Sequence, residues 1–547
     1  MDFDAILIPP RRAAMIEHGL WFDRTINDHL DDCVRDCPDK VALTALAVEQ
    51  DRKTVFTYRE LATMAERIAV GLTRLGVQRN DVVSCQLPNW WQFSAMVLAC
   101  SRIGAVFNPL MHIFRERELS FMLAHGESKV VVVPKVFRGF DFEQMMAGLR
   151  SRLPALQHVL AIGGDGPDSF EARLTAPSWE REPDAAAILG ASRPGPDDVM
   201  QLIYTSGTTG EPKGAMHSAN TLMSNIVPYI ERMRLSSDDT VLMASPLAHQ
   251  TGFMYGLMMP VMMQGAAVLQ DVWEPKTAVG LIRGHGVSFT MASTPFLTDL
   301  ARTVAETGIG VPTLRTYLCA GAPIPGPLVE QARAALGSKI VSAWGMTENG
   351  AITTTLLGDD DERSVNTDGC AMPGIDVKVV DLDGQALPTG AEGKLLARGC
   401  SLFGGYLKRP QLNGVDAEGW FDTGDLARID EQGYIRICGR SKDVIIRGGE
   451  NIPVVEIEAL LYRHPAVAQV AIVAYPDERL GERACAVVSV KPGQSLTFDA
   501  MIEFLLAQKV AKQYLPERLE LRDALPTTPT GKIQKFKIRA ALKDSTL

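Results

Sequence analysis

Apolar and polar positions follow two periods along most of this chain, those of buried strands and of helices that cover them. Thr57 to Glu60 forms a capping box, and apolar residues follow at helical spacing up to Gly76. The apolar run Val82 to Leu87 predicts a strand, and 95–103 predicts a helix. We expect this alternation to continue to about residue 400, which indicates parallel sheets covered by helices.

The pattern changes after Arg440. There it predicts a helix over 455–462, strands over 467–474 and 484–490, and a helix over 498–509. A segment of this size is typical of a domain. We therefore predict an α/β fold with two domains. Residues 1–440 form a large N-terminal domain of several subdomains with parallel-rich sheets, and residues 441–547 form a small, mobile α+β domain.

Composition excludes several classes of protein. The net charge of −10 over 547 residues argues against a nucleic-acid surface, which needs clustered cations. Nine scattered cysteines suggest neither a disulfide framework nor a zinc site, and the N-terminus lacks the features of a signal peptide, so we expect a cytoplasmic protein. The longest apolar run, Phe253 to Leu269, contains Gly256 and Pro260 and predicts a buried helix leading into a strand, not a membrane span.

A glycine- and hydroxyl-rich loop follows the apolar strand Val199 to Ile203. Glycines let a backbone approach a ligand closely, and hydroxyls, main-chain N–H groups and a lysine donate to phosphoryl oxygens. It is not a P-loop, because Pro212 stands where that motif needs its second glycine. A flexible linker is the alternative, but linkers seldom follow a buried strand. The candidate phosphate-binding residues are Thr205, Ser206, Gly207, Thr208, Thr209, Gly210 and Lys213.

The run Tyr204 to Gly214 resembles the signature of the adenylate-forming superfamily, which includes acyl-CoA synthetases, luciferases and peptide-synthetase adenylation domains. Further motifs similar to those of that family follow in order, at Trp344–Glu348, Thr423–Asp425, Gly439–Asp443 and Pro529–Ile533. The resemblance covers roughly residues 25 to 545. It implies an acid–thiol ligase that uses ATP, Mg²⁺ and coenzyme A to convert a carboxylic acid to an acyl-AMP and then to an acyl-CoA.

The resemblance also implies roles for single residues. Lys532 would be the cation at the α-phosphate, Glu348 the magnesium ligand, and Thr347 a hydroxyl contact to phosphate. Asp425 would hold the ribose hydroxyls, and Arg440 would contact the nucleotide. Taken singly, each motif is equally typical of a surface turn; their order and spacing favour the functional interpretation. The remaining nucleotide contacts would be Gly321, Ala322, Pro323, Trp344, Gly345 and Met346.

The family's small domain rotates between two half-reactions, which places the hinge here at Lys442. Gly448, Gly449 and Glu450 would then line the tunnel for the CoA thiol, although a plain β-turn is the alternative. Lys532, in a mobile domain, would also be a target for a lysine acetyltransferase.

The acid itself is predicted from the segment after His249. His249 resembles a gate at the mouth of the acyl pocket, although a structural histidine is the alternative, and Phe253, Met254 and Trp344 would line the pocket. The aspartate that pairs with an amino-acid substrate in relatives is missing here. The chain looks most like ligases of medium-chain fatty acids and cyclohexanecarboxylate, and Asn413-Gly414 departs from the family pattern outside the ATP motifs. The alternatives are a stand-alone adenylation enzyme that loads a carrier protein, an aryl-CoA (benzoate-type) ligase, and a nucleotide-binding regulator.

Overall fold

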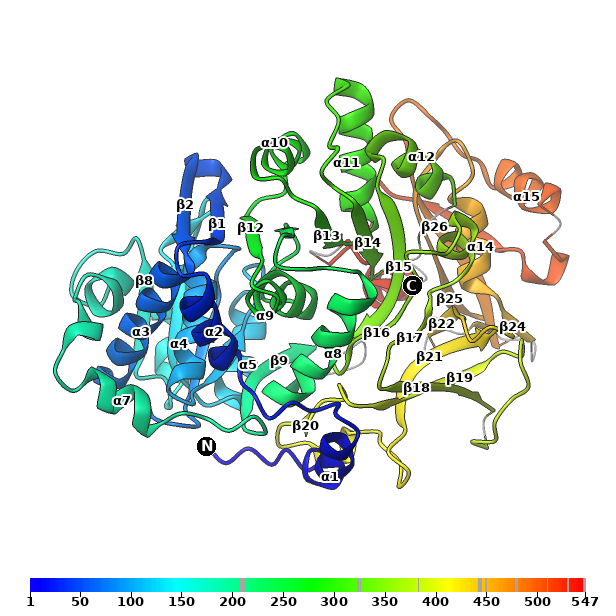
Figure 1. Ribbon diagram of the computed structural model, residues 1–547. Coiled ribbons are helices and arrows are strands. Elements are labelled where there is room, and N and C mark those ends of the chain that lie inside the picture. Colours follow the sequence, from blue (N-terminus) through cyan, green and yellow to red (C-terminus); the bar gives the residue numbers. More distant parts are fainter. Residues whose placement is uncertain are drawn as a thin grey trace.

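The computed structural model describes residues 1–205, 212–321, 324, 326–381, 383–440, 445–447, 450–477, 481–508, 510–528 and 531–544. Two large sheets dominate its first two thirds, and a smaller sheet built from the last hundred residues lies at the opposite end (Figure 1).

The larger sheet has nine strands. All its internal pairs are parallel from β1 to β15, and the strands at its ends, β2, β16 and β17, are antiparallel to their neighbours. Leu242 faces the cluster formed by α10, α11 and α12, and its neighbours Val241 and Met243 face the main core. The order is β17 (Cys370–Ala371), β16 (Gly350–Thr354), β15 (Lys339–Met346), β14 (Thr316–Ala320), β13 (Phe289–Ala292), β11 (Thr240–Met243), β12 (Ala266–Gln270), β1 (Val41–Ala47) and β2 (Arg52–Thr57).

The second sheet has seven strands, and its central members are parallel. Its last two pairs are antiparallel and join the strand before the phosphate loop to β10 and then to the short β20. The order is β20 (Gly405–Tyr406), β10 (Lys213–Ser218), β9 (Val199–Thr205), β4 (Val106–Pro109), β3 (Val82–Cys85), β5 (Ser128–Pro134) and β8 (His158–Ile162). A two-stranded hairpin, β6 (Val136–Phe137) and β7 (Phe140–Asp141), stands apart.

Helices cover these sheets as the periodicity predicts. The capping box at Thr57 is confirmed, because the Thr57 N–H donates to Glu60 Oε2 at 2.8 Å and the helix begins at the next residue. The helices are α1 (Pro9–Glu17), α2 (Ile26–Asp36), α3 (Tyr58–Arg74), α4 (Trp91–Arg102), α5 (Glu116–His125), α6 (Phe142–Leu149), α7 (Ala185–Ala191), α8 (Ala219–Arg232), α9 (Met259–Met262), α10 (Pro275–His285), α11 (Thr294–Thr307), α12 (Gly326–Leu336) and α13 (Asp361–Asn366).

The expected alternation up to about residue 400 is wrong in its last part. From Ile375 to Arg440 the chain builds an antiparallel sheet instead, in the order β18 (Ile375–Val380), β19 (Gly393–Gly399), β21 (Phe421–Ile429) and β22 (Ile435–Arg440). Tight turns make this possible: Asp381 accepts from the Gln385 N–H, and Asp430 accepts from the Tyr434 N–H. Neighbouring antiparallel strands need no covering helix between them.

The C-terminal segment has its own core. Alternate residues of its central strands face opposite sides: Val470 and Ile472 pack with α14 and α15, and Ala471 and Val473 pack with α16. Its elements are β23 (Ile445–Arg447), β24 (Glu450–Ile452), α14 (Val454–Leu461), β25 (Val467–Asp477), β26 (Gly481–Val490), α15 (Phe498–Ala507), β27 (Arg518–Leu521) and α16 (Lys535–Asp544). The change from one sheet to the next falls between residues 440 and 445, and the two-domain division at 440 is our proposal.

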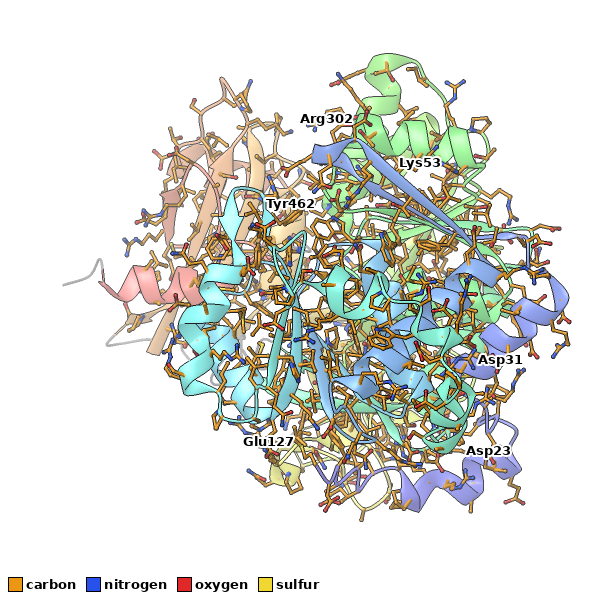
Figure 2. All side chains as sticks on the ribbon, turned by 90° about the vertical axis from the view of Figure 1, so that its left-hand side faces the viewer. Asp23, Asp31, Lys53, Glu127, Arg302 and Tyr462 are labelled. Carbon is orange, nitrogen blue, oxygen red and sulfur yellow. The ribbon has the colours of Figure 1, made fainter. Side chains whose placement is uncertain are left out.

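The surface carries both charge signs side by side. Figure 2 shows Asp23, Glu127 and Arg302 at the margins of the molecule. Each belongs to an exposed ion pair: Arg12 with Asp23 at 3.0 Å, Lys408 with Glu127 at 2.6 Å, and Arg302 with Asp299 at 2.7 Å. Such pairs contribute little to stability, so the fold rests on its cores.

Candidate functional site

A buried carboxylate lies where the nine-stranded sheet meets the antiparallel sheet. Asp425, on β21, is 3% exposed and accepts a hydrogen bond from the indole N–H of Trp344 at 3.0 Å. The Nε of Arg440, on the neighbouring strand β22, lies 2.8 Å from its other oxygen. Three residues that the sequence separates by almost a hundred positions therefore form one contact group, and all three were predicted to touch the nucleotide.

The turn between β15 and β16 carries the second predicted group. Gly345 must be glycine here, because a Cβ would lie 2.1 Å from the carbonyl oxygen of Gly350. The turn continues through Met346 and Thr347, whose carbonyl accepts from His217 Nε2 at 2.9 Å. Since His217 is buried, its pKa falls to about 4 and the ring stays neutral at neutral pH.

Glu348, in the same turn, is 6% exposed and joins a three-membered cluster. The hydroxyl of Tyr406 donates to Glu348 Oε1 and accepts from the ammonium of Lys213 at 2.8 Å. Burial and the neighbouring Glu348 charge raise the pKa of the Tyr406 phenol well above its usual value, so it stays protonated and donates. The predicted metal ligand and the predicted phosphate-loop lysine are thus linked through a residue that the sequence did not single out.

The rest of the phosphate loop, Ser206 to Gly210, lies outside the described residues. Thr205 ends β9, and its buried hydroxyl has no hydrogen-bond partner among the described residues. Gly321 has a positive φ of 89°, with no atom within 4 Å of a built Cβ. Ala322, Pro323, the hinge residue Lys442, and Gly448 and Gly449 also lie outside the described residues, and only the backbone of Glu450 is described, as the first residue of β24.

His249 lies in a tight turn. Its N–H donates to Pro246 O at 3.0 Å, and its Nδ1 accepts from the Thr251 N–H at 3.3 Å, so the neutral ring carries its proton on Nε2. Gly252 follows because a Cβ there would lie 2.2 Å from the Pro246 carbonyl oxygen. Burial, and then the positive charge of Lys532, lower the pKa of His249 to about 4.

The side chain of Asn89 is hydrogen-bonded to the turn that contains His249. Its side-chain amide donates to Ser245 O at 2.9 Å, and its oxygen accepts from the Leu247 N–H at 2.8 Å. Sequence analysis did not select Asn89. The available signal was its place just after β3, since polar groups at the carboxyl ends of parallel strands often belong to a site.

Lys532 reaches the site from the far end of the chain. Residues 526–528 pair with 531–534: the Gly531 N–H donates to Thr528 O at 2.8 Å, and the Lys532 N–H donates to Thr528 Oγ1 at 3.0 Å. Gly531 packs on Pro295 at the start of α11, so closely that a Cβ would lie 2.5 Å from Pro295 Cγ. This packing brings Lys532 near enough to His249 for its charge to act on the ring, although 283 positions separate the two residues.

Two of the predicted acyl-pocket residues, Phe253 and Met254, lie in a π-helical turn, Gly252–Met258. Phe253 is fully buried, and its ring lies 6.2 Å from that of Phe107, in the core between the sheets. Met254 points to the β15–β16 turn, since its Cε lies 2.9 Å from a Cβ built on Gly350. Trp344 was also predicted to line the pocket, but its indole N–H is hydrogen-bonded to Asp425.

Next to Met254, Tyr255 and Asn225 form a hydrogen-bonded network that was not predicted from the sequence. Tyr255 OH donates to Asn225 Oδ1 at 2.5 Å and accepts from the Ala351 N–H at 2.9 Å, while Asn225 Nδ2 donates to Ala351 O at 2.7 Å. Tyr229 stacks on Tyr255 at 4.4 Å. These groups satisfy one another, which fixes helix α8 against the β15–β16 turn.

Metal chemistry here would depend on few protein ligands. Among the described residues, no group of three or more His, Cys, Asp or Glu side chains could enclose an ion. Mg²⁺ bound with nucleotides usually takes one or two carboxylates and completes its shell with phosphate oxygens and water. The buried carboxylate of Glu348, linked through Tyr406 to Lys213, fits that mode of binding.

Comparison with known proteins identifies the class that this fold and site define. A family model described as AMP-binding enzyme matches residues 30–407, and one described as AMP-binding enzyme C-terminal domain matches residues 456–532. The chain belongs to the AMP-binding enzyme family, and within it to the AMP-forming acid–CoA ligases. The prediction of an adenylate-forming enzyme with an α/β fold is thereby confirmed.

Individual relatives match over nearly the whole chain. A medium-chain fatty-acid–CoA ligase of Escherichia coli is 35% identical over 97% of this chain and 92% of its own length. A salicylyl-CoA synthase / salicylate adenylyltransferase of a Streptomyces species is 33% identical over 96% of this chain and 95% of its own. The crystal structure of ATP-bound MatB from Rhodopseudomonas palustris superposes with a TM-score of 0.82 at 28% identity, over 96% of this chain and 100% of that one.

Among the described residues, every helix is too short or too polar to cross a bilayer.

Proposed function

We propose that this enzyme activates an apolar, medium-sized monocarboxylic acid, a medium-chain fatty acid or cyclohexanecarboxylate, and transfers the acyl group to coenzyme A. The acid's carboxylate oxygen attacks the α-phosphorus of ATP, the bond to pyrophosphate breaks, and acyl-AMP forms. The CoA thiol then attacks the acyl carbonyl, and AMP leaves.

The observation that carries this proposal is the docking of the Lys532 segment on α11, where Gly531 packs on Pro295. The ammonium lies close enough for its charge to lower the pKa of His249. A cation at this point can neutralise the α-phosphate and the carboxylate as they meet, and this is the main electrostatic demand of adenylation. Gly531 packed on Pro295 keeps the lysine there. We infer that this arrangement serves the first half-reaction, and that rotation about Lys442 brings Gly448 to Glu450 to the thiol.

The other site residues have roles that follow from their contacts. Asp425, held by Trp344 and Arg440, presents a carboxylate that can accept hydrogen bonds from two ribose hydroxyls. Glu348 would hold Mg²⁺, which when bound neutralises phosphate charge. Thr347 and the hydroxyls of the phosphate loop would complete the contacts to phosphate. The side chain of Lys532 is exposed, so a lysine acetyltransferase could reach it and remove the charge that adenylation requires.

The apolar character of the acid rests on the segment behind His249. Met254 and the glycines of the β15–β16 turn meet there, and the polar groups of Tyr255 and Asn225 are already paired with each other. A second charge on the acid would enter without a partner from this network, at a cost of several kcal/mol.

A second candidate is an aryl acid with a hydroxyl beside its carboxylate, as in the salicylate relative. Gln250, next to His249, is 3% exposed, and neither atom of its amide has a hydrogen-bond partner among the described residues. A ligand hydroxyl that paired with it would remove a penalty of about 1–3 kcal/mol.

The test is steady-state kcat/KM for CoA thioester formation with hexanoate, octanoate, decanoate, cyclohexanecarboxylate, benzoate, salicylate, a dicarboxylate and an amino acid. We expect the value to rise about fourfold for each added methylene until the pocket is full, because a buried methylene contributes about 0.8 kcal/mol. A preference for salicylate that Gln250→Leu abolishes would establish the second candidate. Activity only with a phosphopantetheinylated carrier protein, and not with CoA, would contradict the ligase assignment itself.

A further inference from the structure

Tyr406 occupies a position between two residues that ATP chemistry requires, and nothing in the sequence motifs marks it. Its hydroxyl contacts both Lys213 and Glu348. The ammonium of Lys213 also lies 4.0 Å from the centre of the Tyr406 ring, over its face. The three residues come from β10, the β15–β16 turn and β20, so only the tertiary fold brings them together.

The ring of Tyr406 is held firmly. Its backbone pairs with Ala215 on β10, and its N–H donates to Asn413 Oδ1 at 2.8 Å. Phe403 packs edge-on against the ring, with 4.6 Å between the centroids. Asn413, which departs from the family pattern, therefore acts as the acceptor that fixes this strand.

The N-terminal segment is hydrogen-bonded to the chain just before β20, and α1 lies beside β20 (Figure 1). The guanidinium of the half-buried Arg11 donates to the carbonyls of Gly399, Leu402 and Phe403, at 3.0, 2.7 and 3.1 Å. The Phe403 N–H in turn donates to Glu348 O at 2.8 Å. This chain of contacts leaves the Tyr406 hydroxyl little freedom to move.

We propose that Tyr406 is a positioning residue for adenylation: its hydroxyl keeps the Glu348 carboxylate apart from the Lys213 ammonium. The inference rests on the proposed function, which assigns Glu348 to Mg²⁺ and Lys213 to phosphate. A phenol has one proton to donate and lone pairs to accept, so it can satisfy both partners at once. Without it, the ammonium and the carboxylate would meet directly, and the carboxylate would become a poorer ligand for a cation.

Tyr406→Phe removes only the hydroxyl and keeps the ring. We expect the Mg²⁺ concentration for half-maximal ATP–pyrophosphate exchange to rise about 10- to 100-fold, the range for losing a hydrogen bond to a charged group. Saturating Mg²⁺ should restore most of the rate. Binding of Mn²⁺ to the enzyme–ATP complex, followed by electron paramagnetic resonance, should weaken by a similar factor. The transfer of a supplied acyl-AMP to CoA should stay unchanged.

Tyr434→Phe is a matched control. Tyr434 OH also donates to a carboxylate, that of Asp359 at 2.8 Å, and Arg363 lies 4.5 Å over its ring. It belongs to another part of the molecule, so we expect wild-type metal dependence. In the double variant Lys213→Met/Tyr406→Phe, Mn²⁺ binding should recover relative to Tyr406→Phe, because the competing ammonium is gone.

Several results would overturn the inference: wild-type metal dependence in Tyr406→Phe, no recovery in the double variant, equal loss in both half-reactions, or a Tyr406→Phe chain that does not fold. Failure of the wild-type enzyme to form acyl-AMP from any acid would instead refute the proposed function. The two failures are therefore distinguishable.

Discussion

Gly531 offers a sharp test of how the small C-terminal unit delivers Lys532. Its φ is +81°, and a Cβ there would lie 2.5 Å from Pro295 Cγ and 3.2 Å from Pro295 Cδ. Non-bonded carbon atoms normally stay about 3.5–4.0 Å apart, so Gly531→Ala must push the hairpin away from α11 by about 1 Å.

Two effects must be separated in that variant. An alanine with a left-handed φ costs about 1–2 kcal/mol wherever it stands. Gly493→Ala isolates this cost, because Gly493 lies in the same C-terminal unit with a φ of +75° and no atom within 4 Å of a built Cβ. The contact with Pro295 is the additional effect in Gly531→Ala, and a misplacement of about 1 Å at a catalytic group lowers the rate about a hundredfold.

The assay is ATP–pyrophosphate exchange with a good acid, beside transfer of a supplied acyl-AMP to CoA. We expect Gly531→Ala to lose about a hundredfold in exchange and little in transfer, while Gly493→Ala keeps both. Lys532→Ala gives the exchange rate that remains without the lysine, with which the other variants are compared.

Pro295→Ala should rescue Gly531→Ala, because it removes Cγ and Cδ and leaves the proline Cβ position, 3.5 Å away, as an ordinary contact. Equal exchange rates for Gly531→Ala and Gly493→Ala, or no rescue by Pro295→Ala, would refute the docking of the lysine hairpin on α11.

Two further predictions concern the hinge and pH. Lys442→Pro would fix φ near −65°, so we expect one turnover of acyl-AMP to form normally while transfer to CoA becomes much slower, and a rapid-quench time course with equal loss of both steps would contradict the hinge. Burial lowers the pKa of His217 from 6.5 to about 4, so the unfolded state binds the extra proton and stability falls as pH drops through that window, by up to about 3 kcal/mol. The midpoint of urea unfolding should be constant above pH 7 and fall towards pH 4.5, and the fall should be shallower in His217→Asn. If the variant and the wild type showed the same fall, the lowered pKa of His217 would be refuted as its cause.

Much of this molecule could be predicted from local patterns. The capping box at Thr57, the strand before the phosphate loop, and two helices and two strands of the C-terminal unit depend on neighbouring residues, because period and capping act over a few positions. The motifs were enough to identify the family, because glycine, hydroxyl and lysine residues at those spacings serve phosphate chemistry. Residues 375–440 were misjudged for the same reason: isolated short apolar runs do not tell whether their partners are parallel or antiparallel.

Contacts between distant segments could not be predicted in this way. Asn89 supports the His249 turn across 156 positions or more, Arg11 binds the loop before Tyr406, and Gly531 touches Pro295. None of these pairings leaves a periodic or compositional trace, because hydrogen bonds and van der Waals contacts act over a few ångströms in space and are indifferent to separation along the chain. Local sequence therefore specified the helices, the strands and the reactive side chains. The packing of the sheets, of the loop with Gly531 and of the N-terminal segment specified which of those side chains meet.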